Sequence, residues 1–140
     1  KRGRQSSANA LAQPSVEHFH EWRKEVKYLR YQIRIIKPIW STMLGRLGDE
    51  LERLGEYLSE DHDLALLRQH MLESVDPTDN RLDLEALIAL IDRCRGELQG
   101  EAKCLGERVY AERPRAFTRR LQVYWQVWRS DEPIDAISVS

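Results

Sequence analysis

A histidine and five cations lie close together on one stretch of the sequence, from His20 to Arg34. The stretch reads HEWRKEVKYLRYQIR, whereas the chain as a whole is nearly neutral, with 22 Lys and Arg against 23 Asp and Glu. Arginine can bind two phosphate oxygens at once, and lysine acts as a mobile point charge. Histidine donates from one ring nitrogen when neutral and from both when protonated. These residue types indicate a surface that binds a polyanion.

Helical geometry sharpens this prediction. At about 100° per residue, the basic stripe centres about 110° from the apolar stripe of the same helix, so it flanks the core instead of opposing it. The basic stripe consists of His20, Arg23, Lys27, Arg30 and Arg34. The apolar stripe consists of Phe19, Trp22, Val26, Leu29, Ile33 and Ile36. A charged face that is merely solvated should point away from the core.

The next helix provides a comparison, because its acidic residues centre about 150° from its leucines, where a solvated face belongs. These acidic residues are Asp49, Glu50, Glu52, Glu56 and Glu60. An alternative explanation of the basic stripe is ordinary ion pairing between helices. In that case Glu52 or Glu56 would pair with Lys24 or Lys27.

The elements that must position these residues are all helices. We expect a short helix over residues 2–13, a helix from Val16 to Ile36 with Ser15 as its N-cap, and a leucine-rich helix over 44–58. The segment SEDHD should interrupt that helix, with Asp63 as the N-cap of a shorter one over 64–74. A turn-rich loop, a long helix over 84–109 and a last helix from Pro114 follow. The fold class is therefore all-α, an antiparallel helical bundle over residues 1–129, with a loose tail over 130–140.

Composition limits the cellular setting. A chain of 140 residues forms one domain and can bury a core without disulfides. Cys94 and Cys104 would lie about 15 Å apart on one helix, too far for a bond, and we expect both to be half-buried. Because there is neither a secretory signal nor a membrane span, we expect a cytoplasmic protein that does not bind membranes.

The motif His20-x-x-Arg23-Lys24-x-x-Lys27-x-Leu29-Arg30-Tyr31 resembles the signature of the CHAD family, the conserved histidine α-helical domain. Residues 1–11, 51–67 and 105–125 are similar to the family's segments before the motif, at its helix junction and at its end. The resemblance implies two pseudo-symmetric bundles around a basic cavity, of which this chain is the C-terminal repeat. Self-association or a missing N-terminal half would then complete the cavity.

The resemblance further implies a non-catalytic protein that binds inorganic polyphosphate, at polyphosphate granules in many members, with no cofactor and no metal. The binding residues it implies are His20, Arg23, Lys24, Lys27, Arg30 and Arg34. Weaker candidates are Arg2, Arg4, Tyr31, Lys103 and Arg119.

Three alternatives remain. His62-Asp63 is the pair of metal phosphohydrolases, but no further ligands have suitable spacing, and His18 and His20 lie about 200° apart on their helix. Specific nucleic-acid binding lacks a base-reading helix, and the pI of about 6.5 is not basic. A protein–protein interaction module would use tryptophans: Trp125 and Trp128 are expected in the core, and Trp40 is the freest to touch a partner.

Overall fold

The computed structural model describes residues 1–74 and 81–131, and these residues form helices without any strand. In chain order the elements are α1 (Arg2–Ala12), α2 (Val16–Ile36), the 3₁₀ turn η1 (Lys37–Trp40), α3 (Ser41–Glu73), α4 (Arg81–Val109) and α5 (Pro114–Asp131). The predicted all-α bundle is confirmed. The turn-rich loop and most of the tail, 132–140, lie outside the described residues, whereas residues 130 and 131 belong to α5 and not to a tail.

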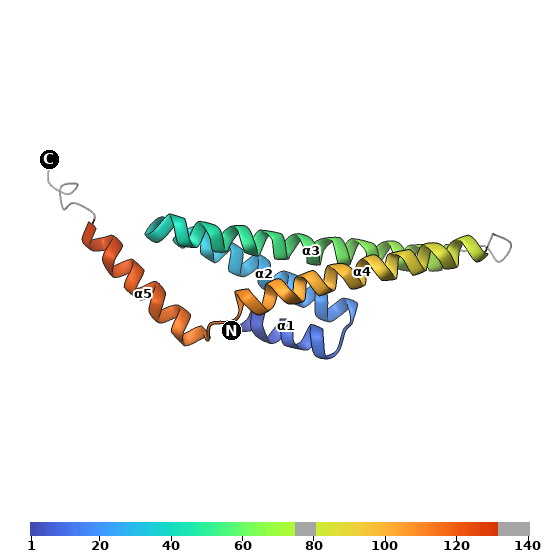
Figure 1. Ribbon diagram of the computed structural model, residues 1–140, viewed down its shortest axis with the longest axis horizontal. Helices are drawn as coiled ribbons and strands as arrows, with labels where there is room; N and C mark the ends of the chain where they lie inside the picture. The colour runs from blue at the N-terminus through green and yellow to red at the C-terminus, as the bar shows by residue number, and fades with distance from the viewer. Residues whose placement is uncertain (75–80, 132–140) are drawn as a thin grey trace.

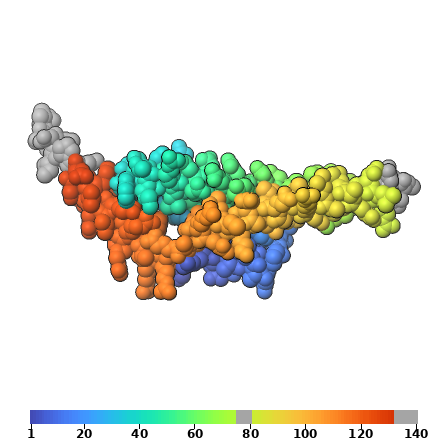
Figure 2. Space-filling view, viewed as in Figure 1, coloured from blue at the N-terminus to red at the C-terminus, as the bar shows by residue number. Residues whose placement is uncertain are grey.

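The first four helices form the bundle, and two of them extend beyond it. Helix α2 packs against α1 and α3, and α4 packs against α3 and, more lightly, against α1. Figure 1 shows that α3 and α4 continue past the ends of α1 and α2 as a two-helix arm, while α5 leaves the bundle at the opposite end. The space-filling view in Figure 2 shows the same elongated outline. The molecule therefore carries an isolated helical feature at each end.

Helix α2 forms where the sequence predicts it. The Ser15 hydroxyl accepts a hydrogen bond from the amide of His18 at 3.1 Å, which satisfies one free donor of the first turn. At the other end the chain tightens into η1 at Pro38, because proline cannot continue the α-helical hydrogen bonds. The predicted apolar stripe faces the core: four of its members are buried and two partly buried. The buried members are Phe19, Trp22, Val26 and Ile33.

Trp22 joins α2 to α4 at the centre of the bundle. Its side chain is fully buried, and its indole nitrogen donates to the Tyr110 hydroxyl at 3.3 Å. Helix α4 passes so close that a Cβ on Gly106 would lie 2.7 Å from the Trp22 ring. A glycine is therefore needed at this crossing, since any side chain would push α4 away from α2.

Helix α3 is one continuous helix of 33 residues, so the prediction of an interruption at SEDHD, with Asp63 as an N-cap, is wrong. No glycine or proline occurs in that segment, and the apolar spacing changes there for a different reason. Asp61 occupies a core position, only 1% exposed, where it accepts hydrogen bonds from Arg95 and Gln99 of α4, each at 3.0 Å. A buried carboxylate that accepts hydrogen bonds from a neighbouring helix interrupts a hydrophobic pattern without ending its own helix.

Helix α5 is the least buried element, and none of its residues is fully buried. Phe117 and Leu121 pack partly against the core, and Tyr124 meets the edge of Trp40 at a ring separation of 4.6 Å. The prediction that Trp125 lies in the core is wrong, because its side chain is 47% exposed. In α4, Cys94 is half-buried as expected, whereas Cys104 is exposed.

Candidate functional site

The basic stripe runs along α2 beside its contact with α3. Because α2 is held by its buried apolar face, the side chains of the stripe emerge at fixed positions along a rigid rod of about 1.5 Å per residue. Lys27, Arg30 and Arg34 are exposed, whereas His20 and Arg23 are half-buried. The stripe therefore changes character along the helix, from partly enclosed at its start to open at its end.

Arg23 is fixed to α3 by one side of its guanidinium. Its Nε donates to the Ser59 hydroxyl at 2.9 Å, and that hydroxyl donates to the Gly55 carbonyl at 2.7 Å. Within residues 1–74 and 81–131, the terminal nitrogens of Arg23 make no hydrogen bond to the protein. The side chain is thus oriented in advance, with donors left over for an anion.

His20 lies against a second histidine that the sequence did not single out as a binding residue. The rings of His20 and His62 are 5.1 Å apart and tilted by 38°. The Nδ1 atom of each ring is buried without a hydrogen-bond partner among the described residues. Only the unbroken course of α3 places His62 here, so its role could not be read from spacing along the chain.

Carboxylates lie on the α3 side of the stripe. Arg30 forms an ion pair with Glu52 of α3, and both side chains remain about half exposed, at 46% and 48%. A shallow groove of about 230 Å³ between the two helices has both charges on its walls. Its charged lining residues are Lys27, Arg30, Glu52, Glu56, Glu60 and Asp63. Glu52, Glu56 and Glu60 are exposed, as expected for a solvated face, and they also line this groove together with Lys27 and Arg30.

Interhelical ion pairing thus accounts for one member of the stripe. The expected pairs involved Lys24 or Lys27, but the residue that pairs with α3 is Arg30. Lys24 instead bonds Glu21 of its own helix at 2.9 Å, and this hydrogen bond and charge raise the pKa of the lysine above its ordinary value. Lys27 and Arg34 form no ion pair with any described residue.

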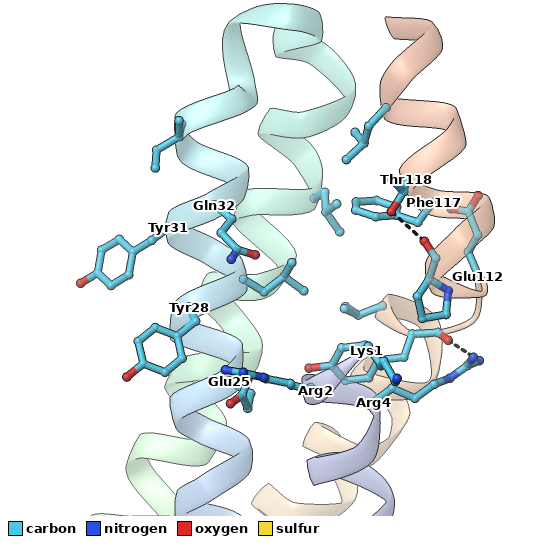
Figure 3. A pocket seen from close by; sticks show the side chains of 18 residues that line it. Lys1, Arg2, Arg4, Glu25, Tyr28, Tyr31, Gln32, Glu112, Phe117 and Thr118 are labelled. Atoms are coloured by element: carbon cyan, nitrogen blue, oxygen red, sulfur yellow. Dashed lines mark hydrogen bonds between the residues drawn. The ribbon is translucent and has the colours of Figure 1, made fainter. Parts of the chain in front are cut away.

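The weaker candidates do not join this surface. Arg4 donates to the Tyr110 carbonyl at 2.7 Å and so caps the end of α4. Arg2 and Tyr31 line a different pocket, of about 760 Å³, between α2 and α5. Figure 3 shows Gln32 pointing toward α5 in this pocket, while the ring of Tyr31 extends outward from α2. Lys103 and Arg119 are exposed on α4 and α5 and line neither hollow.

The larger pocket has a different chemistry from the stripe. Its lining is mainly apolar, from Leu29 and Leu47 of the bundle and Phe117 and Leu121 of α5. Arg120 is not among its lining residues and is held by Glu112 at 2.7 Å, a hydrogen bond that raises the pKa of the guanidinium. Lys1, Arg2 and Arg4 also line this hollow, but apolar side chains dominate it. The stripe holds its cations in one row on a single helix, so it is the better candidate site for a highly charged polymer.

Two further features bear on the alternatives. Among residues 1–74 and 81–131, no three His, Cys, Asp or Glu side chains are close enough together to hold a metal ion. No helix in the same part of the chain has the length and hydrophobicity needed to cross a membrane.

Comparison with known proteins identifies the family. No curated protein and no solved structure matches the chain. A family model described as the CHAD domain matches residues 1–72, a region that contains α1, α2 and almost all of α3. The likeness of residues 105–125 to the end of that domain lies beyond the match and stays a prediction. The matched half of the chain includes the whole motif from His20 to Tyr31, and the chain belongs to the CHAD domain family.

Proposed function

We propose that the chain is a non-catalytic binding module for inorganic polyphosphate, with the basic stripe of α2 as its binding surface. The observation that carries the proposal is that several cations of the stripe have hydrogen-bond donors free to bind an anion. Lys27 and Arg34 are exposed, and neither forms an ion pair with a described residue. The terminal nitrogens of Arg23 make no hydrogen bond to the same part of the chain. Membership of the CHAD domain family supports the same function. We further propose that binding takes place in the cytoplasm, at polyphosphate granules.

The polymer has the chemistry that such a surface can use. Polyphosphate offers a repeated negative charge without bases to stack on or edges to read. A row of cations at helical pitch on a rigid support is sufficient to bind it, because the contacts are charge-assisted hydrogen bonds that need no sequence register. From His20 to Arg34 the stripe is about 21 Å long.

The acidic groove restricts where the polymer can lie. An anion inside the groove would meet Glu52, Glu56 and Glu60, which repel it. An anion on the outer side of the stripe meets Lys27 and Arg34 without that cost. Arg30 would exchange Glu52 for phosphate at little expense, since a half-exposed ion pair contributes at most about 1 kcal/mol. We therefore place the polymer along the outer edge of α2.

The pair His20 and His62 gives the surface a second kind of donor. A protonated imidazole donates from both nitrogens and adds a positive charge next to Arg23.

Titration calorimetry of polyphosphate beside a DNA oligonucleotide of equal charge tests the function. We expect polyphosphate to bind the 140-residue chain more tightly than the DNA at the same salt concentration, because the stripe recognises dense charge and offers no stacking surface. Equal affinity for the two polymers would mean a general polyanion surface. No heat and no gel shift with either polymer would refute the proposal.

One observation favours a second function, a protein–protein interaction. Tyr28, Tyr31 and Ile35 of α2 are exposed, with Ile35 at 77%. These side chains form an apolar strip beside the cations, and a partner with an acidic, apolar helix could cover both. Binding of such a partner in place of polyphosphate would assign the stripe to recognition of a protein.

A further inference from the structure

The arm formed by α3 and α4 exposes more apolar surface than two helices can bury. Beyond the ion pair of Asp61 with Arg95, the described part of the arm buries only Ala65 and Ile91. Six leucines there are between 45% and 76% exposed. They are Leu66, Leu67, Leu72, Leu82, Leu87 and Leu90.

A two-helix arm has a single seam, so side chains that flank the seam stay in water unless a third helix covers them. Isolated leucines on a surface need no explanation, but six exposed leucines within one short arm amount to an apolar surface of the extent that is typical of an interaction site. The arm is also acidic. In its described residues, 61–74 and 81–95, the arm contains six Asp and Glu residues and four arginines, a net charge of −2.

The other end of the molecule carries a helix with complementary properties. Helix α5 has four arginines and one aspartate, a net charge of +3. Its Trp125 and Trp128 rings lie 5.2 Å apart, and Arg129 stacks over Trp125 at 6.0 Å. Val123 and Val127 are about half exposed. Aromatic and arginine side chains grouped in this way are typical anchors of protein interfaces.

The arm and α5 of one molecule cannot meet, because they lie at opposite ends of the elongated fold (Figure 1). We propose that two copies of the chain associate side by side and antiparallel, each placing its α5 on the arm of the other. The two contacts are then equivalent by a two-fold axis, which closes the assembly at two copies. Each arm becomes a three-helix unit, and the tryptophan pair of α5 is covered at the same time.

The charges of the two surfaces favour this arrangement over a second one in which the arms of two molecules pair. Two arms could also pair with each other as a four-helix bundle. That contact would bring two acidic segments together, each with a net charge of −2 in its described residues, whereas α5 on the arm joins +3 to −2. Like charges across an interface oppose association, and opposite charges favour it. The proposal uses neither the basic stripe nor polyphosphate, so it does not depend on the proposed function.

Sedimentation equilibrium of the 140-residue chain, free of polyphosphate, tests the proposal through paired charge reversals. The unaltered chain should reach twice its mass of 16.5 kDa as concentration rises. One variant carries Arg115→Glu and Arg129→Glu on α5, and the other carries Glu73→Arg and Glu85→Arg on the arm. All four side chains are exposed, so both variants should keep the circular dichroism of the parent.

Each variant alone should dimerise at least about tenfold more weakly, because both of its contacts join like charges. An equal mixture of the two should recover the dimer, since α5 of each copy then meets an arm of opposite charge. A chain that stays monomeric at all concentrations overturns the proposal. A dimer that the α5 variant does not weaken also overturns it, because α5 would then lie outside the contact, as in arm-to-arm pairing. A mixture that fails to associate has the same consequence.

Discussion

Replacing Lys27, Arg30 and Arg34 together with glutamine removes three cations from the exposed part of the stripe and keeps the aliphatic stems and the helix propensity. The three side chains are exposed, and only Arg30 has an ion-pair partner on another helix, Glu52. Each cation beside an anionic surface contributes about 1 kcal/mol, so the triple variant should lose about 3 kcal/mol of binding free energy. That loss corresponds to about a hundredfold in the dissociation constant for polyphosphate.

The salt dependence of binding should fall in parallel. By analogy with single-stranded nucleic acids, each lost phosphate contact lowers the slope of log affinity against log salt by about 0.7, or about 2 for three contacts. The free energy of unfolding should change by less than about 1 kcal/mol, because a half-exposed ion pair is lost while repulsion between neighbouring cations is relieved. Calorimetry at several salt concentrations and urea unfolding measure the two effects separately.

The matched control removes three exposed cations from α4 by replacing Arg81, Arg93 and Arg108 with glutamine. Both variants have the same net charge, so a loss of affinity caused by total charge alone would be equal in the two. We expect the control to bind within about threefold of the parent, since screening by salt weakens charges that are distant from the ligand. An equal loss of polyphosphate affinity in the two variants would refute our reasoning. So would a triple stripe variant that is strongly destabilised but binds polyphosphate with an unchanged salt slope.

Three further predictions concern single positions. Glu52→Gln frees Arg30 and should tighten polyphosphate binding by up to about fivefold in calorimetry, and weaker binding would contradict the competition we infer. Ile33→Ala, at a side chain 2% exposed, should cost about 2–5 kcal/mol in urea unfolding, and a cost below about 1 kcal/mol would remove Ile33 from the core. Burial raises the pKa of the Tyr110 hydroxyl above its ordinary value of 10.0, against a smaller lowering by its bond to Trp22. The contribution of this raised pKa to the free energy of unfolding is therefore complete below pH 10.0 and is lost as the pH rises through the raised pKa. The free energy of unfolding of Tyr110→Phe should therefore fall less steeply at alkaline pH than that of the parent. An equally steep fall in the two proteins would contradict this assignment.

Local patterns in the sequence determined where α2 lies and which side it buries. Ser15 and Pro38 mark its ends by the hydrogen bonds they make or cannot make, and the apolar spacing of Trp22 and Val26 allows only one buried face. The motif that begins at His20 also placed the chain in its family, because a motif is a property of one contiguous segment. These features depend on residues within a few helical turns of one another, so the sequence alone is sufficient to predict them.

The tertiary structure alone decided which groups from different helices meet. Within the continuous α3, the buried charge of Asp61 is compensated by Arg95 of α4, more than thirty residues away. The same continuity brings His62 to His20, and the crossing of α3 with α2 brings Glu52 to Arg30. A helical pattern fixes the angle of a side chain about its own axis, but it contains no information on the rotation of one helix against the next. That rotation is set by packing, and it determines how much of the basic stripe stays open to an anion.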